Sequence, residues 1–579
     1  MCQPHKPPER VIMNYQPALD DLHFILHEVL KAPAQLQALT AFADTDADLM
    51  RQVVEEAGKF VAQEIAPLQG VGDAIGCKFS GGKVKTPPGF REAYQAFWQA
   101  GWPALACATE DGGQGLPVVL EAVLYEMLSA ANHGWTMAPG LLHGAYECIK
   151  HHGSEALKNQ YLEKVATGQW LATMCLTEPH AGSDLGLVRT KALPQQDGSY
   201  RLGGTKIFIS GGEHDLTENI VHLVLARLPD APAGTKGLSL FLAPKVMADG
   251  TPNAIHCERI EEKMGLHGSP TCVMRFDDAT GWMIGEPHRG LNAMFVMMNA
   301  ARLHVGLQGI GLLEAAWQKA DAYSKERRQM RAPKPKMSGT PDPIAEHPAM
   351  RRILSTQRAW IDGGRVLAYR TAIELDVAKN HPDAERRHSA GQWCSLVTPV
   401  LKAAWTAQAF YGSSECLQVF GGHGYVREWG IEQIVRDSRV GMIYEGTNEI
   451  QAIDLLVRKV MPDCGAGLFA MLLALCDGLD NRVPGHAEFL AQVAELRHIT
   501  GALVQAARTD QELPYWVADD YLRAAALALL AWAWLQISGA SNALTSSANP
   551  ARWAEPANAM HCWILPEFDM RLKIIKARL

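Results

Sequence analysis

The sequence lacks closely spaced cysteines and a continuous apolar run at its N-terminus. Its twelve cysteines are scattered, and Cys464 and Cys476 are the nearest pair, so the chain has no C-x-x-C motif and no tight disulfide framework. This spacing is typical of a reducing compartment, and we expect a cytoplasmic location. Residues 1–17 mix charges with prolines, so we expect neither a signal peptide nor a membrane anchor there.

Basic residues are not in excess, and the common nucleotide and metal motifs are missing. The chain has 54 Lys and Arg against 62 Asp and Glu, a net charge of −8, which does not favour a protein that neutralises a phosphate backbone. Nucleic acid is therefore not an expected partner. There is no G-x-G-x-x-G after a strand, no G-K-[ST], no H-E-x-x-H and no G-x-S-x-G. We therefore expect no classical NAD or ATP site, no serine hydrolase elbow and no metal.

The hydrophobic pattern divides the 579 residues into several regions. An N-terminal extension covers 1–39, and helical spacing follows over 40–168. Short apolar runs separated by Gly, Pro and Asp predict a β domain over 169–285, with strands at 200–209, 220–228, 238–242 and 271–276. Helical spacing returns over 286–460 and continues as an additional helical domain over 461–579. The fold class predicted is mainly α with a central β domain.

The most apolar run of the chain, at 524–537, lies in the last of these regions. Gln536 interrupts it, and it is shorter than the roughly 20 residues that span a bilayer. We interpret it as a buried core helix and expect no membrane span.

Three polar segments in the first two thirds of the chain each allow a functional and a purely structural interpretation. Residues 175–184 alternate hydroxyls and glycines, which suits a polar ligand or a capped turn. Residues 206–212 form a strand that ends in small residues, and Phe208 could lie on a flat ring. Residues 326–329 end a helix with two arginines, which suits phosphate or a solvated helix end.

Two further segments follow near residue 420 and residue 445. In 418–425 three glycines permit close approach of the backbone to a ligand or form a helix C-cap, and His423 is more typical of a structural histidine. In 443–451 Glu445 stands between an aromatic residue and a glycine, and desolvation there would raise its pKa into the range of a general base. The same segment could instead be a helix N-terminus capped by Thr447.

Taken together and in this order, the five segments resemble the acyl-CoA dehydrogenase family. The resemblance implies a helical N-terminal domain, a β-barrel-like middle domain and a helical bundle, with 286–460 as the FAD and catalytic domain. The extra C-terminal helices, with residues 14–21 and 211–219, resemble the long bacterial subgroup that includes 3-methylmercaptopropionyl-CoA dehydrogenases. The implied activity is FAD-dependent α,β-dehydrogenation of an acyl-CoA to the 2-enoyl-CoA. The acyl group would be 3-methylmercaptopropionyl or a short to medium straight chain.

The resemblance also implies roles for individual residues. Glu445 matches the base that removes the α-proton, and its backbone N–H matches a donor to the thioester carbonyl, while the β-hydrogen leaves as hydride to the flavin. Ala301 stands where some relatives hold an alternative base, so Glu445 has no rival. Substrate contacts are implied for Ser183, Arg302, Tyr444 and Gly446. FAD contacts are implied for Thr177, Gly182, Ser183, Phe208, Ser210, Arg327, Gln418, Gly421, Gly422, Thr447 and Glu449. Phe208 replaces the usual tryptophan, and Glu449 replaces the usual glutamine.

The resemblance implies partners and leaves alternatives open. Arg327 matches an arginine that usually contacts the FAD of a neighbouring subunit, which implies a homodimer, and electron-transferring flavoprotein is the expected electron acceptor. An acyl-CoA oxidase using oxygen is a nearby alternative. A DNA-associated flavoprotein of the same superfamily is disfavoured, because residues 461–579 hold nine basic and twelve acidic residues. The intact 444–447 segment disfavours a noncatalytic scaffold.

Overall fold

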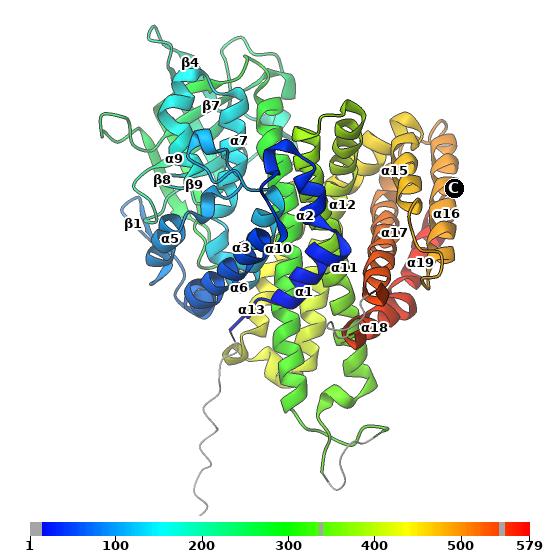
Figure 1. The fold of residues 1–579 in the computed structure, drawn as a ribbon. Helices are drawn as coiled ribbons and strands as arrows, with labels where there is room; N and C mark the ends of the chain where they lie inside the picture. The colour runs from blue at the N-terminus through cyan, green and yellow to red at the C-terminus, as the bar shows by residue number, and fades with distance from the viewer. Residues whose placement is uncertain (1–13, 335–339, 544–549) are drawn as a thin grey trace, which may run out of the picture.

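The computed structural model describes residues 14–334, 340–543 and 550–579 of the chain. Figure 1 shows an N-terminal helical region and a β domain on one side, long central helices, and a C-terminal group of helices on the other side. The predicted fold class, mainly α with a central β domain, is confirmed. The first part of the predicted N-terminal extension, residues 1–13, lies outside the described residues. Its remainder forms α1 (Leu19–His23), a π-helical turn (Phe24–Val29) and α2 (Ala32–Gln37).

The N-terminal helical region is built around the helix Val118–Thr136, almost all of whose residues are buried. Its main helices are α3 (Ala47–Phe60), α5 (Phe90–Gln99), α6 (Val118–Thr136) and α7 (Leu142–His152). Pro117 offers no capping side chain to α6, and Asp376 from a distant helix accepts the Val118 N–H at 2.8 Å instead. Asn132 leaves helical geometry (φ −160°, ψ 87°) and so bends the end of α6, where the candidate site begins.

A short hairpin within this region was not predicted from the sequence. Strands β1 (Lys78–Ser80) and β2 (Lys83–Lys85) pair antiparallel around Gly81 and Gly82, whose φ angles are 56° and 77°. Two positive φ angles in a two-residue loop define the turn that matches strand twist, and glycine adopts them without steric cost. The Gly-Gly pair was the signal in the sequence, and the surrounding helical pattern concealed it.

The β domain closes on itself. Its strands are β3 (Leu171–Cys175), β4 (Lys191–Pro194), β5 (Tyr200–Ser210), β6 (Ile220–Arg227), β7 (Leu238–Pro244), β8 (Ile255–Ile260) and β9 (Thr271–Ile284). Strand order is β3-β6-β4-β5-β9-β7, and β7 also pairs with β6, so β6, β4, β5, β9 and β7 form a closed ring as in a barrel, with β3 added beside β6. Each of the four predicted strands is present, and β9 runs eight residues further than predicted. Past Phe276 the strand stays paired with β5 as far as Gly281, and residues 282–284 then pair with β7.

Three long helices form the centre of the molecule: α10 (Gly290–Glu326), α11 (Pro348–Asn380) and α12 (Ala384–Val419). A buried ionic network joins α10 and α11 to α6. Arg365 of α11 is fully buried, and its Nη2 lies 2.7 Å from Glu126 of α6 and 3.0 Å from Glu314 of α10. Glu314 also pairs with Arg358 at 2.7 Å. Because each charge has partners, the helices can bury these groups without leaving one uncompensated.

The C-terminal helices pack against the central bundle. They are α15 (Ala466–Cys476), α16 (His486–Ala506), α17 (Leu513–Ala543), α18 (Pro550–Ala559) and α19 (Pro566–Lys576). Helix α17 is long and apolar enough to cross a membrane, but 78% of its most apolar window is buried in the protein against neighbours that include α11 and α12. The predicted core helix at 524–537 is therefore part of a buried helix. Arg552 pairs with Asp362 at 2.9 Å and with Asp21 at 2.7 Å, which ties both ends of the chain to α11.

Candidate active site

Glu445 lies in a tight turn between α13 (Ile431–Ser438) with its following 3-10 turn and α14 (Asn448–Ile453). Its φ is 57°, in the left-handed region that costs a residue with a Cβ about 1–2 kcal/mol. Gly446 follows with φ 82°, and a Cβ there would come within 2.8 Å of Gln451 Nε2. Thr447 then caps α14 by accepting the Ile450 N–H at 3.4 Å. The predicted helix N-terminus is therefore present, and it presents a strained carboxylate just before the cap.

The surroundings of Glu445 favour its neutral form. Its side chain is only partly exposed, and burial raises the pKa of its carboxyl group to about 7, although Arg302 and Lys402 act in the opposite direction. Within the described residues, the Glu445 backbone N–H donates to no protein acceptor. The turn therefore offers a carboxylate of suitable basicity next to a free hydrogen-bond donor.

Tyr444 extends from the same turn toward the bent end of α6. Its hydroxyl donates to Gln308 Oε1 of α10 at 2.5 Å, lies 3.4 Å from His133 Nε2, and lies 3.8 Å from the Met137 sulfur. Burial lowers the pKa of His133 to about 4, so this histidine is neutral at pH 7. These contacts of the Tyr444 hydroxyl hold the turn against α6 and α10. Because the phenol and His133 are both neutral, they add no formal charge to the site.

Arg302, on α10, carries a positive charge that acts on the Glu445 carboxylate. Its side chain is 11% exposed, and its only ion pair within the described residues is a distant one, with Nη1 4.0 Å from Asp454. Its Nε is buried and has no hydrogen-bond partner. A buried guanidinium with a free donor is suited to an acceptor on a ligand, such as a thioester or amide oxygen of the substrate.

The β domain brings a second group of predicted residues to one edge. Thr177, Gly182 and Ser183 lie in the loop after β3, and Phe208 and Ser210 lie at the end of β5; the Ile207 N–H donates to the Thr177 carbonyl at 2.9 Å. Phe208 has φ 59° and a side chain that is 61% exposed. An aromatic side chain held outward in a strained conformation is available to lie against a ligand ring.

Sequence reasoning missed the residues that hold this loop. Lys206 is fully buried, and its Nζ donates to Glu178 Oε1 at 2.9 Å and to the Leu176 carbonyl at 3.0 Å. Glu178 also accepts from the Arg189 and Thr190 N–H groups. Both residues lie inside segments that the sequence marks as polar, 206–212 and 175–184, but only the tertiary structure shows that they pair.

The two groups meet at the end of α6. A Cβ built on Gly211, next to Ser210, would lie 4.0 Å from Ala138, and the preceding Met137 contacts Tyr444. The end of β5 and the Glu445 turn therefore both lie next to the residues that follow the bend in α6.

A third group of predicted site residues lies far from the Glu445 turn of the same chain. Arg327 at the end of α10 and Gln418, Gly421 and Gly422 at the end of α12 are exposed, and no atom comes near a Cβ built on either glycine. Lys402, which contacts the Glu445 turn, precedes Gln418 by 16 helical residues, about 24 Å along the axis. His423 is structural here, since its Nδ1 lies 2.9 Å from the Tyr323 hydroxyl and its ring stacks on Trp429.

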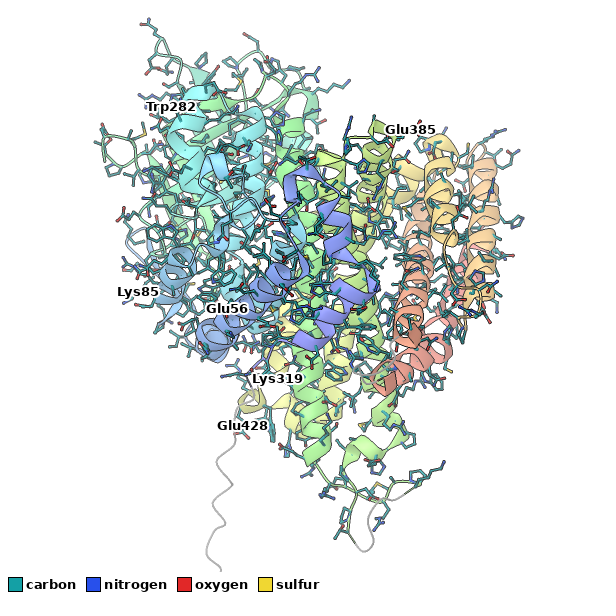
Figure 2. The ribbon with its side chains drawn as sticks, in the orientation of Figure 1. Glu56, Lys85, Trp282, Lys319, Glu385 and Glu428 are labelled. Carbon is teal, nitrogen blue, oxygen red and sulfur yellow. The ribbon has the colours of Figure 1, made fainter. Side chains whose placement is uncertain are left out.

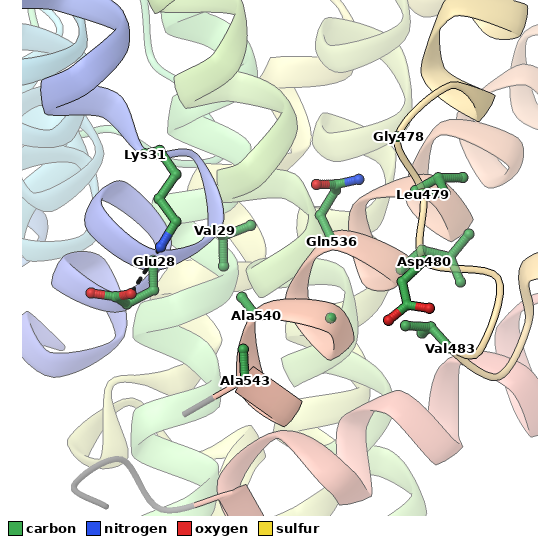
Figure 3. Close-up of a pocket in the computed structure, with 12 residues that line it drawn as sticks. Glu28, Val29, Lys31, Gly478, Leu479, Asp480, Val483, Gln536, Ala540 and Ala543 are labelled. Carbon is green, nitrogen blue, oxygen red and sulfur yellow. Dashed lines mark hydrogen bonds and ion pairs between the residues drawn. The ribbon is translucent and has the colours of Figure 1, made fainter. Parts of the chain in front are cut away.

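Two surface cavities belong to the C-terminal region and not to these groups. The larger, of about 520 Å³, lies between the π-helical turn after α1, the loop after α15, and α17 (Figure 3). Its lining is mainly small and apolar, and the Lys31 and Glu28 side chains at its rim pair with each other at 3.0 Å. The second, of about 350 Å³, is an apolar groove between α15 and α16. Neither holds any residue predicted to be functional.

Family comparison covers most of the chain. Residues 48–169 match the acyl-CoA dehydrogenase N-terminal domain, residues 173–279 the acyl-CoA dehydrogenase middle domain, and residues 288–460 the acyl-CoA dehydrogenase C-terminal domain. The three matches fall on the helical region, the β domain and the central helices, respectively. Residues 461–579 lie beyond all three matches.

Individual relatives extend the similarity. The chain is 43% identical to 3-methylmercaptopropionyl-CoA dehydrogenase of Ruegeria pomeroyi over 84% of this chain and 83% of that protein. It is 36% identical to the broad-specificity linear acyl-CoA dehydrogenase FadE5 of Mycobacterium tuberculosis over 79% of this chain and 77% of that protein. The structure of Caenorhabditis elegans ACDH-11 in complex with C11-CoA has a TM-score of 0.80 and 19% identity, covering 99% of this chain and 95% of that one. The C-terminal helices are therefore part of a known fold.

Proposed function

Because the chain belongs to the acyl-CoA dehydrogenase family and is an oxidoreductase of acyl-CoA thioesters, we propose that Glu445 is its catalytic base and FAD its cofactor. The reaction proposed is removal of one hydrogen from Cα and one from Cβ to give the 2-enoyl-CoA. The observation that carries this proposal is the Glu445 turn, where a strained, largely enclosed carboxylate stands beside a free backbone N–H.

The residues present fit FAD. Phe208 presents an exposed ring from a left-handed backbone position, and the Thr177 and Ser210 hydroxyls lie on the same edge of the β domain. Gly182, Gly421 and Gly422 have open space where a side chain would stand, so a flat or phosphorylated ligand could approach their backbone closely. FAD, when bound, supplies an acceptor for the hydride that leaves Cβ.

The chain's own residues carry the proton chemistry. The Glu445 carboxylate takes the α-proton, and its backbone N–H donates to the thioester oxygen as negative charge develops there. Arg302 binds a substrate oxygen, and Tyr444 keeps the turn against α6 and α10. Each of these groups is fixed by the fold before substrate arrives, which lowers the cost of orienting them.

The rate of α-proton removal is expected to rise with pH and to level off above about 7. Glu445 acts as a base only when deprotonated, and burial raises the pKa of its carboxyl group to about 7 in the protein without substrate. Below that pH the protonated form predominates and the rate falls about tenfold for each pH unit. Stopped-flow measurement of flavin reduction at pH 5 to 9 tests this. A rate independent of pH over that range would exclude Glu445 as a base of this pKa.

The visible spectrum of the purified protein tests the proposed reaction. Recorded without oxygen, the flavin band is expected to bleach on addition of 3-methylmercaptopropionyl-CoA or a short to medium straight-chain acyl-CoA. The 43% identity to the Ruegeria pomeroyi enzyme supports the first of these substrates. A protein without flavin that FAD cannot reconstitute would contradict the proposal. Fast reoxidation by air after bleaching would indicate an oxidase.

We also propose a homodimer that transfers electrons to electron-transferring flavoprotein in the cytoplasm. The support for a dimer is that Arg327, Gln418, Gly421 and Gly422 lie exposed and far from Glu445, as expected if they serve the FAD of a second subunit. Tyr425 and Val426, which follow this group, are 89% and 47% exposed, so this surface also carries apolar side chains that a second subunit could cover.

A further inference from the structure

Lys402 is a fully buried lysine in the middle of α12. Its Nζ donates to the Gly446 carbonyl at 2.7 Å and to the Asn448 Oδ1 at 2.9 Å. Both acceptors lie just after Glu445. Lys402 is therefore the point at which α12 holds the turn that carries the proposed base.

No close ion pair offsets the free-energy cost of burying the Lys402 ammonium group. No carboxylate in the described part of the chain lies within 4.0 Å of its Nζ, and its acceptors are neutral oxygens. Burial lowers the pKa of its ammonium group, and the charge of Glu445 opposes this decrease. A methionine of similar length would avoid this cost, so the ammonium is better explained by its effect on the turn than by packing.

Hydrogen bonds to successive backbone carbonyls hold the Glu445 turn in place. Gln451 Nε2 donates to the Glu445 carbonyl at 3.0 Å, Lys402 donates to the Gly446 carbonyl, and Asn448 Nδ2 donates back to Ala403 of α12 at 3.0 Å. Glu445 and Gly446 both have positive φ, so these bonds hold an unfavourable conformation in place. Without the hydrogen bond from Lys402, the backbone of Glu445 and Gly446 could leave its positive-φ conformation, which would change the direction of the Glu445 side chain and N–H.

We propose that Lys402 is a positioning residue for Glu445, acting through the Gly446 carbonyl and through its positive charge. The hydrogen bond from Lys402 orients the Glu445 carboxylate and backbone N–H, and the ammonium charge of Lys402 favours the ionised form of Glu445. This inference rests on the proposed function of Glu445 and adds to it a residue that touches neither substrate nor the reacting atoms.

Other charged groups face the pair from the surrounding helices. Arg302 of α10 acts on both Glu445 and Lys402, and Glu449 of α14 acts on Lys402. Beyond these, Asp454 pairs with Arg302, while Arg439 and Asp519 of α17 face Glu449. These groups are unchanged by substitutions at Lys402, so a change in the pH profile of such variants reports the loss of the Lys402 charge itself.

The test is the pH profile of anaerobic flavin reduction in three variants of the full-length FAD-loaded protein. Lys402→Met removes charge and donor, Lys402→Gln removes the charge alone, and Lys402→Arg keeps the charge. For Lys402→Met we expect the maximum rate to fall about 10- to 100-fold, as a misplaced base would cause. We expect the apparent pKa of the rate to rise by about one pH unit in the Met and Gln variants and to stay unchanged in the Arg variant.

Lys263→Met is the matched control, because Lys263, a half-buried lysine, also donates to a main-chain carbonyl, that of Ser269 at 2.9 Å, in the loop before β9. It should keep the parent rate and profile. If Lys402→Met does not fold, the Gln and Arg variants decide the matter. Gln and Arg profiles that both match the parent would overturn the role of Lys402 while leaving Glu445 as base. A parent protein that no acyl-CoA bleaches would overturn the proposed function itself.

Discussion

Glu445→Gln is expected to keep the fold and the flavin and to lose about 10²- to 10⁴-fold in the rate of flavin reduction by acyl-CoA, the usual contribution of a general base. Glutamine has nearly the same shape, and the bonds that hold the turn go to main-chain carbonyls and not to the Glu445 side chain. The amide cannot accept the α-proton. Anaerobic stopped-flow measurement, with the flavin absorbance as the check on cofactor content, gives the rate.

The same substitution at Glu385 provides the control. Glu385 is exposed at the start of α12, far along the helix from the turn (Figure 2), and Glu385→Gln should react like the parent. The Glu445→Gln variant should also lose the pH dependence near 7, because the titrating carboxyl group is gone. A Glu445→Gln protein that turns over within tenfold of the parent would remove Glu445 from the mechanism.

Arg365→Met is expected to lower the free energy of unfolding by about 3–5 kcal/mol, which is typical when one partner of a buried ionic network is removed. Arg365 is fully buried, and Glu126 depends on it for positive charge, whereas Glu314 also has Arg358 at 2.7 Å. Methionine fills the space but leaves Glu126, among the described residues, with only the Tyr369 hydroxyl. The midpoint of thermal unfolding, followed by circular dichroism with FAD in excess, should fall by about 2–4 °C, since the shift per kcal/mol is small for a chain of this length.

A surface pair separates this effect from the loss of an arginine in general. Arg351 of α11 pairs with Glu555, and their side chains are 54% and 47% exposed. Arg351→Met should shift the midpoint by about 1 °C at most, because exposed ion pairs contribute little. Adding Glu126→Gln to Arg365→Met should recover part of the loss, since it removes one unpaired charge. If Arg365→Met unfolds at the same temperature as Arg351→Met, the network does not stabilise the bundle.

The fold class was readable from the sequence because each element bears its own local signal. The period of the apolar residues changes from helical to alternating near residue 169 and back near residue 286. Thr447 caps α14 as its position before an acidic turn predicted. The hairpin at Gly81 and Gly82 was missed because two three-residue strands are too short to interrupt a helical pattern.

The family, the order of the regions and the segments that carry the predicted site residues could all be predicted from the amino-acid sequence, because motif residues and hydrophobic periods are local properties of the chain. Which polar residues meet depends on how the helices and strands pack in three dimensions. Lys402 reaches Gly446 across 44 positions, Lys206 reaches Glu178 across 28, and Arg365 reaches Glu126 across 239. Such pairs leave no periodic trace in the sequence, because each lysine or arginine is defined as a partner only by the helix or strand packed against it. The same packing sets the pKa of Glu445, since burial and neighbouring charges are properties of the folded chain.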